Sequence, residues 1–193
     1  MQTNKGGKGL KSRARIMGAA AYEFSNHGFH DTKVSSIVSR AGLTQPAFYL
    51  YFESKEAIFD ELVTDFRMRL LTMTKDLRLS IGLQSGELKQ QVLEAITTLF
   101  RFLAENPDLS RIGLFLAHDA EQFKEQAIKL VAGNLSAEQK AGYYRSELSM
   151  DIVAASILGA IERLTLSRLL PKISTPEAIA QEIVDLLMNG MMN

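Results

Sequence analysis

The chain has 193 residues, of which 46% are hydrophobic and 23% are charged, and this is the composition of a folded globular protein. It contains no cysteine, which excludes disulfides, thiol catalysis and cysteine-ligated zinc. Basic and acidic side chains are equal at 22 each, yet residues 1–60 carry eight basic and five acidic ones, so a basic amino-terminal part precedes an acidic remainder. This distribution is typical of a chain whose one end meets phosphates.

The sequence shows no sign of a membrane segment. Its apolar runs stay short of the ~20 residues that a membrane-spanning helix needs, and no apolar segment follows the early lysines. We therefore expect a cytoplasmic protein without a membrane partner.

The chain begins with a basic segment. Three glycines and three lysines among the first eleven residues predict a flexible arm over residues 1–11. The arm has two interpretations: a solvated tail, or a segment that follows the backbone or minor groove of DNA. From Ser12 onward, Ile16 and Phe24 share one helical face, and Gly28 is expected to end this first helix.

Residues 32–55 are predicted to form two short helices separated by a tight turn. Val34, Ile37 and Val38 fall three to four residues apart and give the first of these helices one apolar face. Gly42 supplies the positive φ with which a chain readily leaves a helix.

The second short helix is expected to begin at Gln45, with the Thr44 hydroxyl as its cap and Pro46 in its first turn. Phe48 and Phe52 are four residues apart and are predicted to face the core. The outward face is then polar and aromatic, with Gln45, Ala47, Tyr49 and Tyr51. Such a pair of helices is typical of a helix-turn-helix that reads the major groove, although any corner of two helices shares the spacing.

Many residues agree at fixed offsets with a known pattern of apolar, glycine, threonine and aromatic positions. They are Ile16, Ala19, Ala20, Phe24, Gly28, Phe29, Thr32, Ile37, Ala41, Gly42, Leu43, Thr44, Tyr49, Tyr51, Phe52, Lys55 and Glu56. On these residues, the segment 16–58 resembles the amino-terminal DNA-binding domain of the tetracycline-repressor (TetR) family. The sequence departs from the family pattern at Glu23, Val38 and Pro46. Glu23 is the most unusual, because a carboxylate at an inward position needs a partner, and the sequence identifies none.

The remainder of the chain is predicted to be helical as well. Helices are expected over residues 54–77, 88–105, 110–116, 119–141, 150–170 and from 176 to the carboxyl end. Residues 150–170 are apolar almost all round, which predicts burial on every side. Together with the resemblance, the pattern predicts an all-α fold of about nine helices. A three-helix helix-turn-helix domain over residues 12–53 is joined to a helical ligand-binding and dimerisation domain over residues 54–193.

The resemblance implies that the partner is double-stranded DNA. Phosphate contacts are expected from Thr44, Tyr49 and Lys55, while Gln45 is expected to pair with adenine and Ala47 to meet a thymine methyl group. The expected DNA-binding set is completed by neighbouring positions, which are Thr32, Lys33, Ser35, Pro46 and Tyr51.

A homodimer is expected, because one short recognition helix reads only a few base pairs. The last two helices carry more apolar surface than a chain of this length is expected to cover by itself. The small or apolar residues expected at the interface are Ala155, Gly159, Ile179, Ile183 and Leu187. The alternative is that these residues pack inside a single chain. By resemblance to the family, the interface is a four-helix bundle and the operator is a near-palindrome.

The resemblance also implies a pocket for a small apolar or amphipathic effector. Aromatic residues on different helices and two polar residues are the candidates for its lining: Phe66, Phe100, Phe115, His118, Phe123 and Glu162. The alternative for the aromatic residues is an ordinary core position, and for the two polar ones a structural hydrogen bond. If a ligand binds, we expect it to favour a state in which the long helix has tilted and the two recognition helices no longer match successive grooves.

Two other classes of protein share parts of this pattern. One is a regulator or architectural DNA-binding protein without a small-molecule effector. The other is a helical-bundle enzyme, but the sequence has no Glu-x-x-His pair, no glycine-rich phosphate loop followed by lysine, and no Gly-x-Ser-x-Gly motif. We therefore expect no catalytic residues, no metal and no cofactor.

Overall fold

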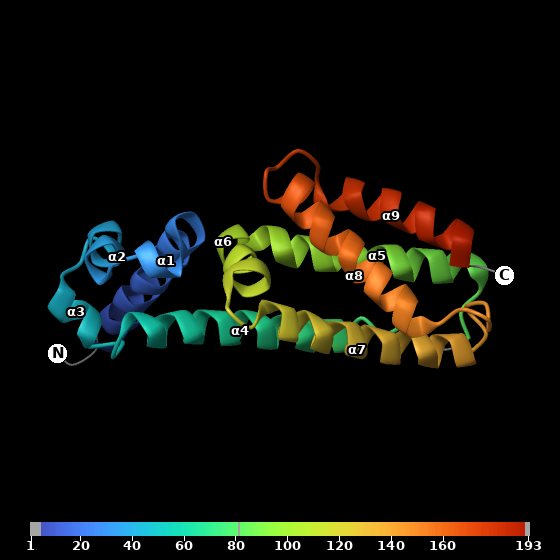
Figure 1. Ribbon diagram of the computed structural model, residues 1–193, viewed down its shortest axis with the longest axis horizontal. Coiled ribbons are helices and arrows are strands. Elements are labelled where there is room, and N and C mark those ends of the chain that lie inside the picture. The colour runs from blue at the N-terminus through green and yellow to red at the C-terminus, as the bar shows by residue number, and fades with distance from the viewer. Residues whose placement is uncertain (1–4, 81, 192–193) are drawn as a thin grey trace. The chain divides into compact units, whose positions relative to one another are not determined.

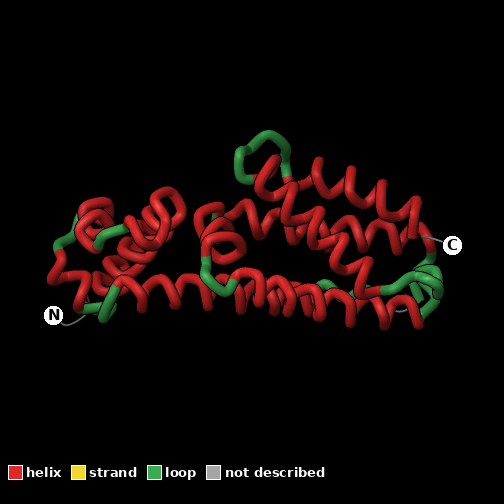
Figure 2. The backbone as a smooth tube through the Cα atoms, in the orientation of Figure 1, coloured by secondary structure: helices red, strands yellow, loops and turns green. Residues whose placement is uncertain are grey.

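Helices and the turns between them make up the computed structural model, which describes residues 5–80 and 82–191 (Figures 1 and 2). No strand occurs in these ranges, which confirms the all-α prediction. The α-helices of the described chain are α1 (Lys5–Asp31), α2 (Val34–Ala41), α3 (Gln45–Tyr49), α4 (Lys55–Asp76), α5 (Ser85–Glu105), α6 (Pro107–Arg111), α7 (Ala120–Lys140), α8 (Met150–Leu164) and α9 (Pro176–Met191). Two π-helical turns, η1 (Ile112–Leu116) and η2 (Thr165–Leu169), follow α6 and α8. None of the helices in the described ranges has the length and hydropathy needed to cross a bilayer.

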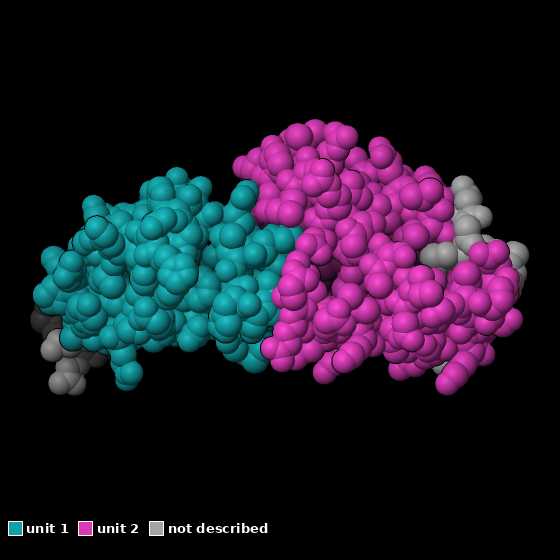
Figure 3. All heavy atoms as spheres, in the orientation of Figure 1, with its two compact units in different colours: residues 1–68, 108–120 teal, residues 69–107, 121–193 magenta. Residues whose placement is uncertain are grey.

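The chain divides into two compact units (Figure 3). The first unit contains the residues up to 68 together with 108–120, and the second contains 69–107 and the residues from 121 onward. The first unit thus extends beyond the predicted boundary between residues 53 and 54. It does so because Ile58, Phe59, Leu62 and Val63 of α4 lie in the core of this unit. Arg67 of α4 also donates hydrogen bonds to the Gly113 carbonyl (3.0 Å) and the Asp119 carboxylate (2.8 Å). The functional boundary at residue 53 stays a prediction.

The core of the first unit is built from the apolar faces of α1 to α4. The predicted inward residues Phe24, Ile37 and Phe48 are fully buried there, and Phe52 is buried as well. The Phe24 ring meets the Phe59 ring edge-on, with centroids 5.1 Å apart. The apolar periodicity of this part of the sequence therefore identified the core correctly.

Helix α1 begins at Lys5, seven residues before the predicted start at Ser12. Residues 5–11, which were expected to belong to a flexible arm, are thus helical, and residues 1–4 lie outside the described residues. Gly28 interrupts the helix with φ 77° and ψ 164°, which agrees with its predicted role as a terminator.

The turn between α2 and α3 depends on Gly42. Its backbone is left-handed, with φ 61° and ψ 40°, and the N–H groups of Gly42 and Leu43 donate to the carbonyls of Ser39 and Val38. The prediction for Gly42 is confirmed, but the one for Thr44 is wrong. Thr44 is the residue before α3, yet its hydroxyl makes no capping hydrogen bond.

The second unit is held by helix packing and by ion pairs between helices. α5 packs against α9, where Leu88, Val184 and Met188 are buried. Ion pairs of 2.8 Å join the same two helices, from Lys89 to Asp185 and from Arg101 to Glu177. A second buried cluster lies between α7, α8 and the loop that connects them: Ala132, Leu135, Tyr144, Met150 and Ala154.

The two loops at one end of this unit are tied to each other. The Tyr143 hydroxyl donates to the Ser80 carbonyl (2.8 Å) and accepts from the Leu83 N–H (2.8 Å). Glu138 accepts a hydrogen bond from the Leu79 N–H (3.2 Å), and burial raises the pKa of its carboxyl group. The loop after α4 is therefore fixed by side chains of α7 and of the loop that follows it.

Within a single chain, residues 150–170 are not buried on every side, so the prediction of complete burial depends on a partner chain. Ile152 of α8 is 69% exposed, and Leu166 of η2 is also exposed. The alternating apolar residues of α8 therefore separate into one face that packs within the unit, with Ala154 and Ile161, and one face that the chain leaves open.

Replacing Gly42 by alanine is expected to lower the free energy of unfolding by about 1–2 kcal/mol, because in left-handed backbone the Cβ of alanine comes too close to the following carbonyl oxygen. A Cβ at this position would also lie 2.7 Å from Nη2 of Arg15, so that side chain must move. Urea unfolding followed by circular dichroism measures the change. Gly18→Ala is the matched control, since a Cβ at Gly18 meets no atom within 4 Å and helix propensity predicts a gain of roughly 0.5–1 kcal/mol. Equal stability of the two variants would contradict the role of Gly42.

Candidate nucleic-acid interface

The outer face of α3 presents groups that can read a base edge. Gln45 and Pro46 are exposed and Ala47 is half-buried, while Phe48 on the opposite face is fully buried. Tyr49 is 56% exposed, and its ring stands edge-on to the Phe48 ring, with centroids 5.3 Å apart. The core thus fixes the direction in which the exposed amide and phenol point. An exposed amide is suited to paired hydrogen bonds with adenine.

Three of the other expected DNA-binding residues lie around the start of α2. Lys33 and Ser35 are exposed there. Thr32 is buried, and its hydroxyl donates to the Gly28 carbonyl at 2.7 Å. The structure therefore uses the Thr32 side chain to close the end of α1, and leaves the neighbouring Lys33 and Ser35 for an external partner.

Lys55 has a structural role in addition to the phosphate contact expected for it. Its ammonium group donates to the carbonyls of Phe29 (2.8 Å), Thr32 (3.0 Å) and His30 (3.4 Å). It also lies 4.4 Å from the centre of the Phe29 ring. Lys55 therefore ties the start of α4 to the turn between α1 and α2, and this turn positions Lys33 and Ser35.

Glu23, the unusual inward carboxylate, has a partner in Arg40 of α2. The Arg40 Nε atom lies 2.5 Å from Oε1 of Glu23, and its guanidinium group stacks on the Tyr22 ring, 3.5 Å from the ring centre. Burial by itself raises the pKa of Glu23, but hydrogen bonds from Arg40 and Ser36 and the charge of Arg40 outweigh it. The pKa of Glu23 is therefore lower than the usual value.

Contacts of α1 place two further arginines beside the helix-turn-helix, and neither was identified from the sequence. Arg13 pairs with Glu61 and lies over the Phe52 ring, 5.0 Å from its centre. The Arg15 guanidinium lies against Gly42, at the turn between α2 and α3. The spacing of residues in the sequence does not predict these contacts, because the partners are 27 to 48 positions apart. The contacts depend on how α1 crosses the other helices.

Tyr51 is half-buried and packs against the core of the first unit. A Cβ at Gly9 of α1 would lie 3.7 Å from its hydroxyl oxygen. Tyr51 was expected to face outward. Its side chain instead lies between α1 and the segment that follows α3, and only part of it is exposed.

The candidate ligand residues are divided between the two units. Phe66, Phe115 and His118 belong to the first unit, and Phe100, Phe123 and Glu162 to the second. The aromatic residues Phe66, Phe100 and Phe123 are buried, as core residues would be, whereas His118 is exposed. Glu162 accepts a hydrogen bond from Lys124 at 2.7 Å. It therefore makes the structural hydrogen bond that was the alternative to a ligand contact.

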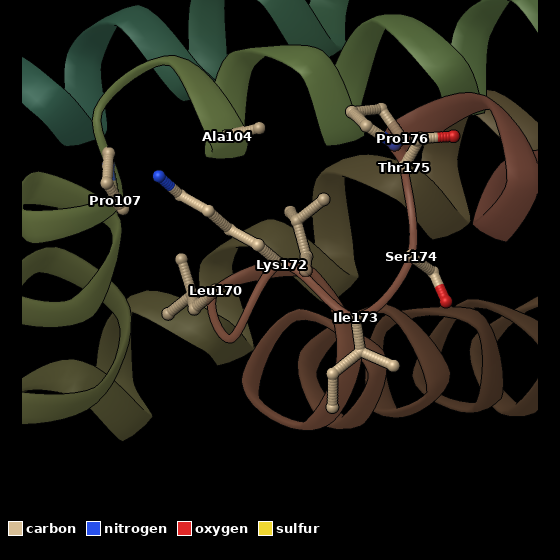
Figure 4. Close-up of a pocket in the computed structure, with 9 residues that line it drawn as sticks. Ala104, Pro107, Leu170, Lys172, Ile173, Ser174, Thr175 and Pro176 are labelled. Carbon is tan, nitrogen blue, oxygen red and sulfur yellow. The ribbon is translucent and has the colours of Figure 1, made fainter.

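A surface hollow of about 280 Å³ lies in the second unit, between the end of α5 and the loop before α9 (Figure 4). Ala104, Pro107 and several residues between Leu169 and Pro176 line it. Lys172 extends across this hollow in Figure 4. None of the six candidate ligand residues lines it, so the predicted pocket and this hollow are different places.

The candidate dimer residues also separate into two groups. Ala155 and Gly159 are exposed on α8, in line with Ile152. Ile179 and Ile183 are buried within the chain, and Leu187 is half-buried against the cluster between α7 and α8. Of the candidate dimer residues, those of α8 are therefore exposed, while those of α9 are buried or half-buried within the chain.

Comparison with known proteins agrees with this geometry. Residues 16–62 match the family model described as bacterial regulatory proteins, tetR family. The HTH-type transcriptional regulator YdgC of Bacillus subtilis (strain 168) is 51% identical over 185 residues, which are 96% of this chain and 95% of the relative. A probable acrEF/envCD operon repressor of Escherichia coli (strain K12) is 26% identical, and the match covers 78% of this chain and 73% of the relative.

A solved structure shows the same fold. The TetR family protein CprB from S. coelicolor A3(2) has a TM-score of 0.73 to this chain at 22% identity, and the match covers 96% of this chain and 90% of that one.

Arg40→Met is expected to destabilise the protein at neutral pH, because it leaves the buried Glu23 carboxylate without its cation. The folded-state pKa of Glu23 lies below 4.5, so the wild-type pair contributes stability above that pH and loses it as the pH falls through the folded-state pKa. In the variant, burial raises the pKa of Glu23 and only the Ser36 hydrogen bond and the His27 charge oppose it, so acidification relieves the penalty. Urea unfolding at several pH values measures the difference between the two proteins, which should shrink toward pH 4.5.

The double variant Glu23→Gln/Arg40→Met is the control for the charge. It should recover part of the loss, since no buried carboxylate remains. A penalty that is independent of pH and equal in the single and double variants would contradict the pairing.

Proposed function

Because this chain belongs to the TetR family of transcriptional regulators, we propose that it is a homodimeric repressor of transcription. It binds a near-palindromic operator and leaves it when a small, apolar or amphipathic ligand binds. The observation that carries the proposal is the exposed face of α3, held by the buried Phe48 and preceded by the left-handed turn at Gly42. The family is one of regulators and not of enzymes, and its bacterial DNA target implies action in the cytoplasm.

Repression is supported by similarity. A similar protein of Escherichia coli (strain K12) is named a probable operon repressor. Base reading is assigned to Gln45, with Ala47 against a thymine methyl group. Phosphate contacts are assigned to Lys33, Ser35, Thr44 and Tyr49, whose side chains are exposed on the same unit. The Thr44 hydroxyl has no capping role in α3, which favours an external partner for it.

Homodimerisation is supported by the open face of α8. Ile152, Ala155 and Gly159 follow one another at intervals of three and four residues, which places them on one side of α8, and Leu166 lies in the π-helical turn η2 that follows. All four are exposed, and no atom lies within 4 Å of the position that a Cβ at Gly159 would take. A row of this kind, apolar and with small residues at its centre, suits close packing against the same row of a second copy.

Most of the candidate ligand residues have another role in the described structure. The buried aromatic residues account for a core, Glu162 already pairs with Lys124, and His118 is exposed. These observations favour a second candidate, which is a regulator of the same family that responds to no small molecule.

Two experiments test the proposal. Selection of bound duplexes from a random library should recover one near-palindromic sequence, and recovery of unrelated sequences would contradict specific binding. A thermal-shift screen should then identify a small apolar ligand. Calorimetric titration should show weaker binding of that ligand to the protein–operator complex, whereas equal affinity with and without operator would exclude release by the ligand.

Gln45→Ala is expected to relax the preference at one base pair in each half-site, with a loss of discrimination of about 1–3 kcal/mol. Lys33→Gln should instead weaken the operator and scrambled duplexes alike, because a phosphate contact carries no sequence information. Fluorescence anisotropy with the selected operator and its single-base variants measures both effects. If both substitutions reduce binding to operator and scrambled DNA equally, the assignment of Gln45 to a base is wrong.

Gly159→Arg is expected to give a monomer, since a long charged side chain keeps the open faces of two α8 helices apart. Gly133→Arg is the matched control, because Gly133 is an exposed glycine within α7 with equal free space around it. Sedimentation velocity should show a monomer for the first variant and a dimer for the second. A dimer in both cases would place the interface elsewhere.

A further inference from the structure

Six cations of the first unit lie between residues 11 and 55, and they fall into two classes. Three of these six already have partners: Arg13 pairs with Glu61, Arg40 with Glu23, and Lys55 donates to backbone carbonyls. Lys11, Arg15 and Lys33 are exposed, and within the part of the chain that the structure describes none of them lies at ion-pair distance from a carboxylate. These three side chains are therefore the ones that carry uncompensated charge toward an external partner.

Two of these three, Lys11 and Arg15, belong to α1, and α1 contacts residues that precede and follow α3 in the sequence. Arg15 lies against Gly42, which precedes α3, while Arg13 covers the ring of Phe52, which follows it. Lys11 and Arg15 are four residues apart, so they share one face of α1. Arg15 therefore lies at the turn before α3, and Lys11 lies about one helical turn away on the same face of α1.

The composition of α1 also calls for an anionic partner. Between Lys5 and Tyr22 the helix carries five basic residues and no acidic one. Cations at the amino-terminal end of a helix oppose its dipole, and Gly6, Gly7 and Gly9 are weak helix formers. A phosphate backbone alongside this segment would compensate the charge that the rest of the chain leaves unbalanced.

The width of a helix decides which part of DNA it meets. With side chains an α-helix is about 10–12 Å across, whereas the minor groove is about 6 Å wide. Because the chain is helical from Lys5, residues 5–15 do not fit into the minor groove as an extended arm would. They can lie over the sugar–phosphate backbone.

We propose that Lys11 and Arg15 of α1 form a second phosphate-binding surface beside the helix-turn-helix, which extends the contact with the DNA backbone past α2 and α3. This inference rests on the proposed DNA-binding function. It assigns to these two residues a contribution to affinity that does not depend on base sequence.

The salt dependence of DNA binding tests the proposal. Each phosphate contact adds about 0.9 to the slope of log K against log salt, so removing one contact from each protomer of a dimer should make the slope shallower by about 1.8. Lys11→Gln and Arg15→Gln are each compared with the wild-type chain on the selected operator and on a scrambled duplex, by anisotropy between 50 and 200 mM KCl. Both duplexes should show the same change, and Arg15→Lys, which keeps the charge, should retain most of the wild-type slope.

Lys129→Gln is the matched control, because it removes an equal charge from an exposed position of α7 in the other unit. Its slope should equal that of the wild type. If Lys11→Gln and Arg15→Gln also leave the slope unchanged while the wild type binds DNA, the proposal is wrong and the proposed function stands. If the wild type binds neither duplex, it is the DNA-binding function itself that fails. Circular dichroism spectra of the variants confirm that they are folded.

Discussion

The reversal of the chain at Gly42 is the constraint on which the DNA-binding unit depends. Only three residues separate α2 from α3, and the left-handed backbone of Gly42 allows both helices to place an apolar face in one core. With Phe48 buried in that core, Gln45 and Tyr49 are directed outward. A recognition helix of five residues has little stability of its own, so its orientation comes from this packing.

Polar contacts fix the helices around that core. Arg40 with Glu23 joins α2 to α1, Arg13 with Glu61 joins α1 to α4, and the Lys55 ammonium holds the turn before α2. Each of these contacts uses a positive charge for the fold. The net basic character of the amino-terminal part is therefore not a direct measure of its charge toward DNA, since three of the six cations between residues 11 and 55 are already paired or bonded inside the unit.

The sequence predicted those features that follow from local periodicity and turn chemistry. The spacing of Phe24, Ile37 and Phe48 placed them in the core, and Gly42 marked the turn, because helix faces and left-handed backbone depend on neighbouring residues. It did not identify the partner of Glu23 or the place of Arg15, since both contacts depend on how α1 crosses α2. Ala155, Gly159, Ile179 and Ile183 were all expected at a dimer interface, but the last two are buried within the chain. An apolar sequence does not tell whether the chain itself or a second copy covers a face.

In the proposed function, the open face of α8 pairs two copies of the chain, and each copy presents one α3 helix to a major groove. Methylation interference at guanine N7, which lies in the major groove, tests that arrangement most directly on the selected operator. The account predicts two sensitive segments related by twofold symmetry, with centres about 10 base pairs or a multiple of that apart. A single sensitive segment, or no interference at guanine N7 in an operator that the protein binds, would contradict it.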